Sequence, residues 1–151
     1  IKRITNPSEF KTLLDDMFDL FKVENEEMGH ALLKHSKDHI INTFADKSIL
    51  AWDFFVWANL AENDKFDGMI AFINDKNEKF GEEIFTEYIW LSKNSMAGTK
   101  LLVTAIKFAR KKEFKYIIMN TVVKHPKSKK ISRFYEKMGF LKDSISYIAK
   151  L

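Results

Sequence analysis

The chain has 151 residues, of which 46% are hydrophobic, and its 25 basic and 21 acidic residues give a formal net charge of +4. This is enough apolar surface for one well-buried core, so we expect a single domain over residues 1–151. The absence of cysteine excludes disulfides, thiol nucleophiles and cysteine-bound metals. No apolar run reaches the roughly 18 residues of a membrane-spanning helix, which favours a soluble, cytoplasmic protein without a membrane partner.

The first part of the chain is predicted to form a strand, two helices and a second strand. Residues 1–5 suit a short strand, and Asn6 and Pro7 then supply an N-cap and a proline at the first helical position. A weaker apolar periodicity predicts a second helix over residues 29–44. Residues 47–60 are apolar on both faces of an extended chain, so we expect a central strand there.

Two further strands are predicted in the middle of the chain. The polar cluster at 61–65 is typical of a turn, and it precedes a strand over residues 66–73. A longer turn at 74–81 then leads to a strand over residues 83–91. These two strands should be adjacent and antiparallel.

The last part of the chain alternates helices with strands. A polar loop at 92–98 opens a helix from Thr99 to about Lys112, followed by a strand over residues 116–123. A strand, a helix and a strand in this order predict a parallel crossover whose first loop faces a ligand site. We expect a helix over residues 127–138 and a final strand over residues 145–151.

The segment KKISRFYEKMGF, residues 129–140, carries the clearest motif. Its apolar residues follow the spacing i, i+3, i+4 and i+7 of one helix face: Ile131, Phe134, Tyr135 and Met138. Gly139 follows where a helix end favours a left-handed residue.

This ending resembles the closing motif of the GNAT acyl-CoA N-acyltransferases, and the order of predicted elements is similar to theirs over essentially the whole chain. The resemblance implies an α+β fold with a mixed central sheet, antiparallel N-terminal strands and helices on both faces. It also implies that Tyr135 lies beside the thioester sulfur as a general acid. The alternative for Tyr135 is a core position with its hydroxyl satisfied at the edge.

The segment SKNSMAGTKLL, residues 92–102, stands where that family carries a glycine-rich pyrophosphate loop. Gly98 fits the second small position, whereas Met96 replaces the first glycine, Lys93 replaces Arg or Gln, and the loop is about two residues short. Backbone N–H groups at a helix N-terminus would bind the phosphates of acetyl-CoA. The alternative is a plain helix start capped by Thr99. The resemblance implies these cofactor-binding residues: Trp90, Leu91, Ser92, Lys93, Met96, Ala97, Gly98, Thr99, Lys100, Ser128, Phe134 and Tyr135.

Glu87 is the candidate general base, because a lone acid in the apolar strand IFTEYIWL is costly to bury without a reason. An exposed edge position or a salt bridge explains it equally well, and Glu83 and Asp53 are weaker candidates. The nucleophile would be the substrate amine itself. The resemblance to the GNAT family implies that the oxyanion faces a backbone N–H of Trp90, Leu91 or Ser92.

A pair of histidines and a run of basic residues do not indicate a metal site or a nucleic-acid site. His35 and His39 are four residues apart, but no third ligand accompanies them, so we expect no metal. The basic run from Lys124 to Arg133 lacks interleaved aromatic residues, which makes nucleic acid an unlikely partner and suits the 3′-phosphate of CoA or solvent.

The resemblance to the GNAT family therefore implies an N-acetyltransferase that moves an acetyl group from acetyl-CoA to a primary amine in a ternary complex. The amine, on a small molecule or a peptide, is not specified, and a homodimer is possible. The first alternative is a degenerate, non-catalytic binding or regulatory module with the same fold. The second is a basic protein associated with nucleic acid.

Overall fold

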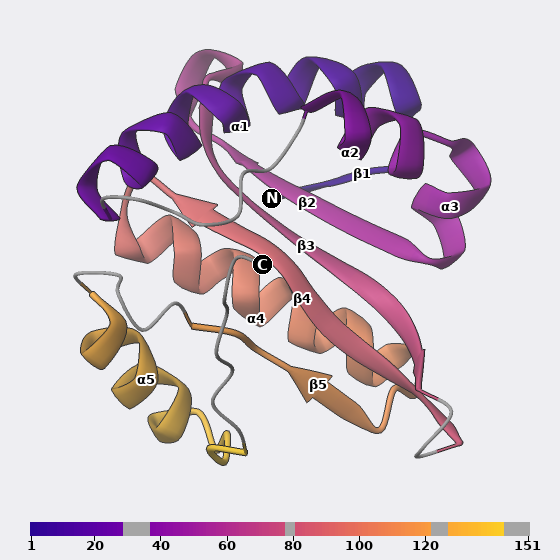
Figure 1. Ribbon diagram of the computed structural model, residues 1–151, viewed down its shortest axis with the longest axis vertical. Coiled ribbons are helices and arrows are strands. Elements are labelled where there is room, and N and C mark those ends of the chain that lie inside the picture. Colours follow the sequence, from indigo (N-terminus) through magenta and orange to yellow (C-terminus); the bar gives the residue numbers. More distant parts are fainter. Residues whose placement is uncertain (29–36, 78–80, 122–126, 144–151) are drawn as a thin grey trace, which may run out of the picture.

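A five-stranded sheet with helices on both faces makes up the computed structural model, which describes residues 1–28, 37–77, 81–121 and 127–143 (Figure 1). The elements follow in chain order: β1 (Lys2–Ile4), α1 (Pro7–Met28), α2 (Lys37–Phe44), α3 (Lys47–Trp52), β2 (Phe54–Leu60), the 3₁₀ helix η1 (Glu62–Asp64), β3 (Phe66–Asn77), β4 (Glu82–Ser92), α4 (Ser95–Lys111), β5 (Tyr116–Ile118) and α5 (Ser128–Lys137).

The strands lie in the order β1-β2-β3-β4-β5. The first four are antiparallel to their neighbours, and β5 pairs with β4 in parallel. This confirms the mixed sheet with antiparallel N-terminal strands. It also confirms the parallel crossover, because α4 connects β4 to β5.

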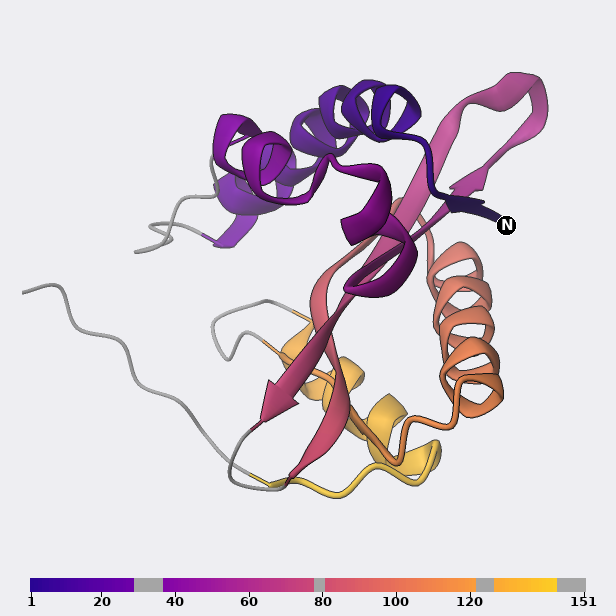
Figure 2. The same ribbon diagram turned by 90° about the vertical axis from the view of Figure 1, so that its right-hand side faces the viewer.

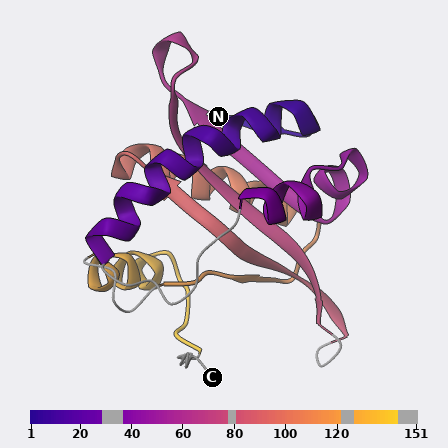
Figure 3. The same ribbon diagram turned by 45° about the horizontal axis from the view of Figure 1, so that its top comes forward.

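Two apolar layers cover the two faces of the sheet. On one face, α1, α2 and α3 contribute core residues such as Phe10, Ile40 and Leu50. On the other face, α4 and α5 contribute residues such as Leu101 and Tyr135. Figure 2 shows the first three helices and α4 on opposite sides of the strands, and Figure 3 shows α1 crossing its face of the sheet. The expectation of helices on both faces is confirmed.

Two predicted helix boundaries are confirmed: the start of α1 and the end of α5. The N–H of Ser8 donates to the Asn6 side chain at 2.9 Å, so Asn6 caps α1 as Pro7 begins it. At the end of α5, Gly139 has φ +89°, a left-handed backbone that glycine adopts without strain.

The predicted strand over residues 47–60 is wrong in its first half, which forms α3. The carboxylate of Asp46 accepts hydrogen bonds from the N–H groups of Ser48 and Ile49, at 2.8 and 3.3 Å. This cap satisfies helix-start donors and selects a short helix in an otherwise strand-like apolar run. The strand begins only at Phe54.

Other boundaries differ by several residues. Strand β3 continues to Asn77, through part of the predicted turn, and β5 ends at Ile118. The predicted second helix begins at Lys37 in the described part of the chain; its residues 29–36 lie outside the description, as does the predicted strand over 145–151. No helix among the described residues is long and apolar enough to span a bilayer.

Candidate active site

Strands β4 and β5 pair only over a short distance and then separate. Their parallel register joins Ile84 to Tyr116, Phe85 to Ile117, and ends at Thr86 with Ile118. Strand β4 continues to Ser92 along β3, whereas the chain after β5 runs toward α5, so the two diverge (Figure 1). The next residues of each segment therefore face a break in the sheet.

Glu87 and Asn120 occupy the start of this break. The Asn120 backbone N–H donates to the carboxylate Oε2 of Glu87 at 2.7 Å, and the Asn120 side-chain Nδ2 donates to the Glu87 carbonyl at 3.0 Å. A side-chain carboxylate thus accepts a backbone donor just beyond the last paired residues of the ladder. The salt bridge considered for Glu87 is absent among the described residues, where the ion pairs involve other acids.

Tyr135 reaches the same residue from α5. Its hydroxyl donates to the Asn120 carbonyl at 3.2 Å, and the side chain is only 8% exposed. Its ring lies 6.0 Å from the Trp90 ring and 5.6 Å from the Phe140 ring, measured between centroids. The structure therefore brings both predicted catalytic residues, Glu87 and Tyr135, to the backbone of Asn120.

Burial shifts the proton affinities of these two groups. Desolvation raises the pKa of Glu87 to about 7, although the hydrogen bond from Asn120 acts in the opposite direction. The pKa of Tyr135 is raised above its ordinary value, mainly by burial and secondarily by the charge of Glu87. Near neutral pH, Glu87 can therefore exchange a proton while Tyr135 keeps its own.

Helix α4 begins at Ser95, before Thr99, which the sequence suggested both as the start of the helix and as its N-cap. Asn94 is the N-cap, and its side-chain oxygen accepts the Ala97 N–H at 2.9 Å, while the Gly98 N–H bonds the Asn94 carbonyl at 3.1 Å. Thr99 lies inside the first turns, with its hydroxyl donating to Ser95. Among the first four N–H groups of the helix, those of Ser95 and Met96 take no part in these two hydrogen bonds.

Gly98 marks a close approach between α4 and β4. A Cβ added there would lie 3.3 Å from the Ser92 side chain and 3.4 Å from the Trp90 ring. This contact explains a small residue at the position, independently of any ligand. Ser92 itself bonds the Asn94 carbonyl through its hydroxyl, so the loop between β4 and α4 is held from both ends.

The remaining predicted cofactor residues lie around this helix start in different settings. The Lys93 amine donates to the Phe66 carbonyl at 2.6 Å and is held against β3. Met96 is 67% exposed, and Lys100 is exposed on α4. The side chain of Leu91 packs on the α1 face of the sheet, opposite to that of Trp90.

Ser128 and Phe134 come from α5, on the far side of the break. Ser128 is the first residue of that helix and is partly buried. The Phe134 ring lies 6.3 Å from the Trp90 ring. The Trp90 ring therefore lies between the start of α4, next to Gly98, and α5, next to Phe134.

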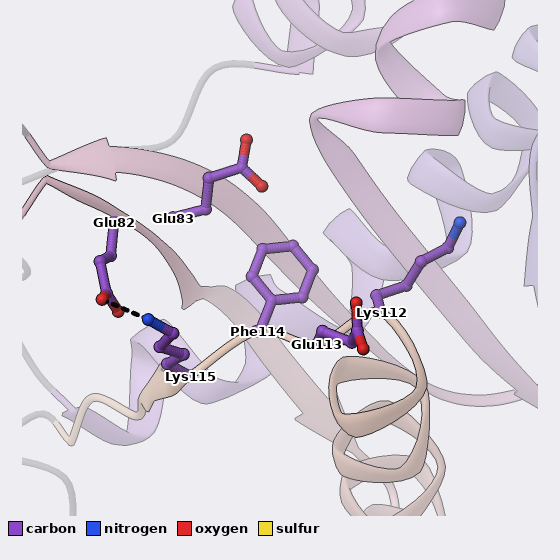
Figure 4. A pocket seen from close by; sticks show the side chains of 6 residues that line it. All are labelled: Glu82, Glu83, Lys112, Glu113, Phe114 and Lys115. Atoms are coloured by element: carbon purple, nitrogen blue, oxygen red, sulfur yellow. Dashed lines mark hydrogen bonds and ion pairs between the residues drawn. The ribbon is translucent and has the colours of Figure 1, made fainter.

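Glu83 and Asp53, the weaker base candidates, are not near Glu87 and Tyr135. Both are exposed and line hollows at the opposite end of the sheet, where α4 turns into β5. Figure 4 shows the hollow that Glu83 lines without Asp53. The two hollows, about 210 and 270 Å³, share Glu83, Lys112 and Phe114. Acidic and basic side chains alternate there, and an ion pair joins Glu82 to Lys115. Neither hollow is lined by Glu87 or Tyr135, the predicted catalytic residues.

The described residues contain no group of three potential metal ligands. His39 is exposed on α2, and His35 lies outside the described part of the chain, as does Lys124. The basic residues Lys129, Lys130 and Arg133 are exposed on α5.

Sequence reasoning missed Asn120. It lies within the predicted strand over residues 116–123, where an amide side chain in the run YIIMNTVV was the available signal. Its role depends on contacts with Glu87 and Tyr135 that join distant parts of the chain.

Solved structures share this fold. An aminoglycoside acetyltransferase from an uncultured soil metagenomic sample, in complex with sisomicin, superposes with a TM-score of 0.73 at 14% identity, covering 99% of this chain and 94% of that one. A putative acetyltransferase from Arthrobacter sp. FB24 gives 0.70 at 17% identity, with the same coverage of both chains. A ribosomal-protein-alanine N-acetyltransferase from Brucella melitensis biovar Abortus 2308 gives 0.67 at 9% identity, covering 99% and 97%.

No protein-family model matches the sequence, and neither does any curated protein. The structural similarity nevertheless extends over nearly the whole length of the chain and of its neighbours. The chain has the α+β fold of GNAT-type acetyltransferases, as its closing motif and element order predicted.

Proposed function

We propose that this protein is an N-acetyltransferase that transfers the acetyl group of acetyl-CoA to a primary amine by direct attack. The observation that carries the proposal is the meeting of Glu87 and Tyr135 at Asn120, where β4 and β5 separate. Glu87, whose pKa burial raises to about 7, suits the removal of a proton from the nucleophile near neutral pH. Tyr135, whose pKa burial also raises, stays protonated and so keeps a proton for the leaving group.

Glu87 would act on the amine. An amine attacks a thioester carbon only through its free electron pair, and a carboxylate with a pKa of about 7 can take its proton directly or through a water molecule near neutral pH. The new C–N bond forms as the carbonyl electrons move to oxygen. A backbone N–H of Trp90, Leu91 or Ser92 would stabilise that oxyanion.

Tyr135 would act on the leaving group. When the tetrahedral intermediate collapses, the C–S bond breaks and the thiolate of CoA takes the tyrosine proton. The hydroxyl now donates to the Asn120 carbonyl, and rotation about its C–O bond redirects the proton without moving the ring. Solvent exchange then returns a proton to Tyr135 and removes one from Glu87.

Acetyl-CoA would bind between the start of α4 and α5. The Ser95 and Met96 amides, near the positive end of the helix, suit phosphate oxygens, and Lys100 adds charge from the same helix. Trp90, Phe134 and Tyr135 would line the thioester end, because their rings lie within 6.3 Å of each other. We propose eight further residues as contacts of acetyl-CoA, to be tested by mutagenesis: Ser92, Lys93, Met96, Ala97, Gly98, Thr99, Lys100 and Ser128.

A non-catalytic module with the same fold is the second candidate. Two observations favour it: the Lys93 amine is bonded to the Phe66 carbonyl, and Ala97 and Gly98 direct their N–H groups to Asn94. These groups are therefore less available to phosphates than a sequence comparison of the loop suggests.

Calorimetric titration with acetyl-CoA separates the two candidates, with CoA and ATP as comparisons. The transferase requires saturable binding of acetyl-CoA that ATP does not reproduce. Absent binding would favour the non-catalytic module. The acceptor follows from a panel that includes sisomicin and a peptide with N-terminal alanine, because structural neighbours are an aminoglycoside acetyltransferase bound to sisomicin and a ribosomal-protein-alanine N-acetyltransferase.

A further inference from the structure

Asn120 uses three of its polar groups on the two residues that the proposed reaction assigns to proton transfer. Its backbone N–H bonds the Glu87 carboxylate, its backbone carbonyl accepts from Tyr135, and its side-chain amide bonds the Glu87 carbonyl. The first two contacts use backbone groups that any residue has. The third contact requires a side chain of the length of asparagine that ends in a hydrogen-bond donor.

The side-chain contact determines where the two backbone groups lie. The described β4–β5 ladder ends at Thr86 and Ile118, so among the residues that the structure describes no further ladder pair fixes the segment after β5 against β4. The bond from Asn120 Nδ2 to the Glu87 carbonyl replaces that pairing by tying the segment to β4 at Glu87 itself. The Asn120 N–H then meets the carboxylate of the same residue.

Packing does not account for this residue. Asn120 is exposed, and the apolar layer around Tyr135 is made by rings and aliphatic side chains of other residues. Shortening Asn120 therefore leaves no cavity in the core. Within the described part of the chain, its side chain and backbone form hydrogen bonds with Glu87 and Tyr135.

We propose that Asn120 is a positioning residue, whose side-chain amide anchors the segment after β5 to β4 so that one residue holds the Glu87 carboxylate and the Tyr135 hydroxyl in place. Asn120 does not itself transfer a proton. Its importance for catalysis rests on the proposed acetyl transfer, whereas its hold on Glu87 is a property of the protein alone.

The test compares Asn120→Ala and Asn120→Asp with the parent protein. Alanine removes the amide, and aspartate keeps the shape but places an acceptor against the Glu87 carbonyl. Asn42→Ala, at an exposed position on α2, is the matched control. The first readout is the titration of the Glu87 side-chain carboxyl carbon by NMR, which requires neither substrate nor turnover.

In both Asn120 variants we expect the midpoint of the Glu87 titration to move to higher pH. The Asn120 N–H stabilises the charged carboxylate, and a loosened segment weakens that bond. Tyr135 is the described titratable group whose pKa responds to the Glu87 charge, and it stays protonated throughout this range. The aspartate variant should shift further, because it adds a negative charge nearby.

The second readout is steady-state kinetics with acetyl-CoA and an accepted amine. We expect kcat to fall about 10-fold or more, a part of the 10²- to 10⁴-fold contribution of a positioned base, with KM for acetyl-CoA unchanged. The rising limb of the pH profile should shift with the Glu87 titration. Should alanine impair folding, the near-isosteric aspartate variant supplies both readouts.

An unmoved Glu87 titration in Asn120→Ala and Asn120→Asp would overturn the inference, whatever the activity. If the Glu87 titration moves in the Asn120 variants but the parent protein acetylates no amine, the positioning role is retained and the proposed function is refuted. Equal shifts in Asn42→Ala would also overturn the assignment, because the effect would not then be specific to Asn120.

Discussion

The Glu87 carboxylate and the Tyr135 hydroxyl bond the backbone on either side of one α-carbon, that of Asn120. The first accepts from its N–H at 2.7 Å, and the second donates to its carbonyl at 3.2 Å. Burial raises the pKa of both side chains, to about 7 for Glu87 and above its ordinary value for Tyr135. The protein therefore holds a proton acceptor and a proton donor in fixed relation where two strands of its sheet diverge.

Replacing Tyr135 by phenylalanine removes the proposed acid and keeps the ring. We expect kcat to fall by about 10²- to 10⁴-fold, because the CoA thiolate would leave without a positioned proton donor. The lost hydrogen bond to Asn120 should cost only about 0.5–1.5 kcal/mol of stability. Kinetics and thermal unfolding of the same sample check both values, and full turnover by the variant would remove Tyr135 from the mechanism.

The rate should depend on the ionisation of Glu87. In the parent protein we expect kcat/KM to rise with pH around a midpoint near 7, as the carboxyl loses its proton. In Glu87→Gln the rate should be lower, and the remaining pH dependence should reflect only the amine substrate. A pH profile that the substitution leaves in place would show that another group is the base.

The same carboxyl should make folding less favourable as pH rises. Its pKa is about 7 in the folded protein and 4.5 ordinarily, so between these values the unfolded chain binds fewer protons than the folded one. The contribution of Glu87 to the free energy of unfolding therefore falls through this window and is constant above it. Urea unfolding of Glu87→Gln and the parent protein should diverge from about pH 5 to about pH 8, with the variant gaining. A constant difference would contradict the raised pKa.

Lys100 should contribute to acetyl-CoA affinity. Reversing its charge in Lys100→Glu places an anion near the helix start that would bind phosphate, so the dissociation constant for acetyl-CoA should increase. Lys107→Glu is the control, because Lys107 is exposed farther along α4 and carries the same charge. Calorimetry should show a larger loss for Lys100. Equal losses would indicate a nonspecific effect of net charge.

Gly98 should tolerate no larger side chain. In Gly98→Val the new Cβ would lie 3.3 Å from Ser92, and the further methyl groups would force α4 away from β4. We expect a stability loss of roughly 1–3 kcal/mol, typical of overpacking, together with weaker acetyl-CoA binding. Thermal unfolding and calorimetry measure the two effects. Parent-like values for both would show that the contact between α4 and β4 is adaptable.

Local signals in the sequence predicted the fold well where one short segment decided the outcome. Asn6 and Pro7 marked a helix start, and Gly139 marked a helix end with the expected left-handed backbone. The helix α3 was missed because a run of apolar residues suggested a strand, whereas the Asp46 cap decides the local structure. Asn94 likewise caps α4 ahead of Thr99.

The candidate site was only partly accessible to sequence reasoning. Glu87 was noticeable as an acid in an apolar strand, and Tyr135 through the closing motif. Asn120 was not, because its significance depends on the short β4–β5 pairing and on hydrogen bonds to residues far away in the chain. The commitment of Lys93 to the Phe66 carbonyl is likewise a tertiary contact that loop spacing does not reveal.

Release of free CoA from acetyl-CoA in the presence of the amine panel tests the central claim most directly, comparing the parent protein with Tyr135→Phe and Glu87→Gln. The account predicts amine-dependent CoA release with an equal amount of acetylated amine, and strong loss of both products in each variant. Absence of transfer to any amine by a parent protein that binds acetyl-CoA, or transfer unaffected by both substitutions, would contradict it.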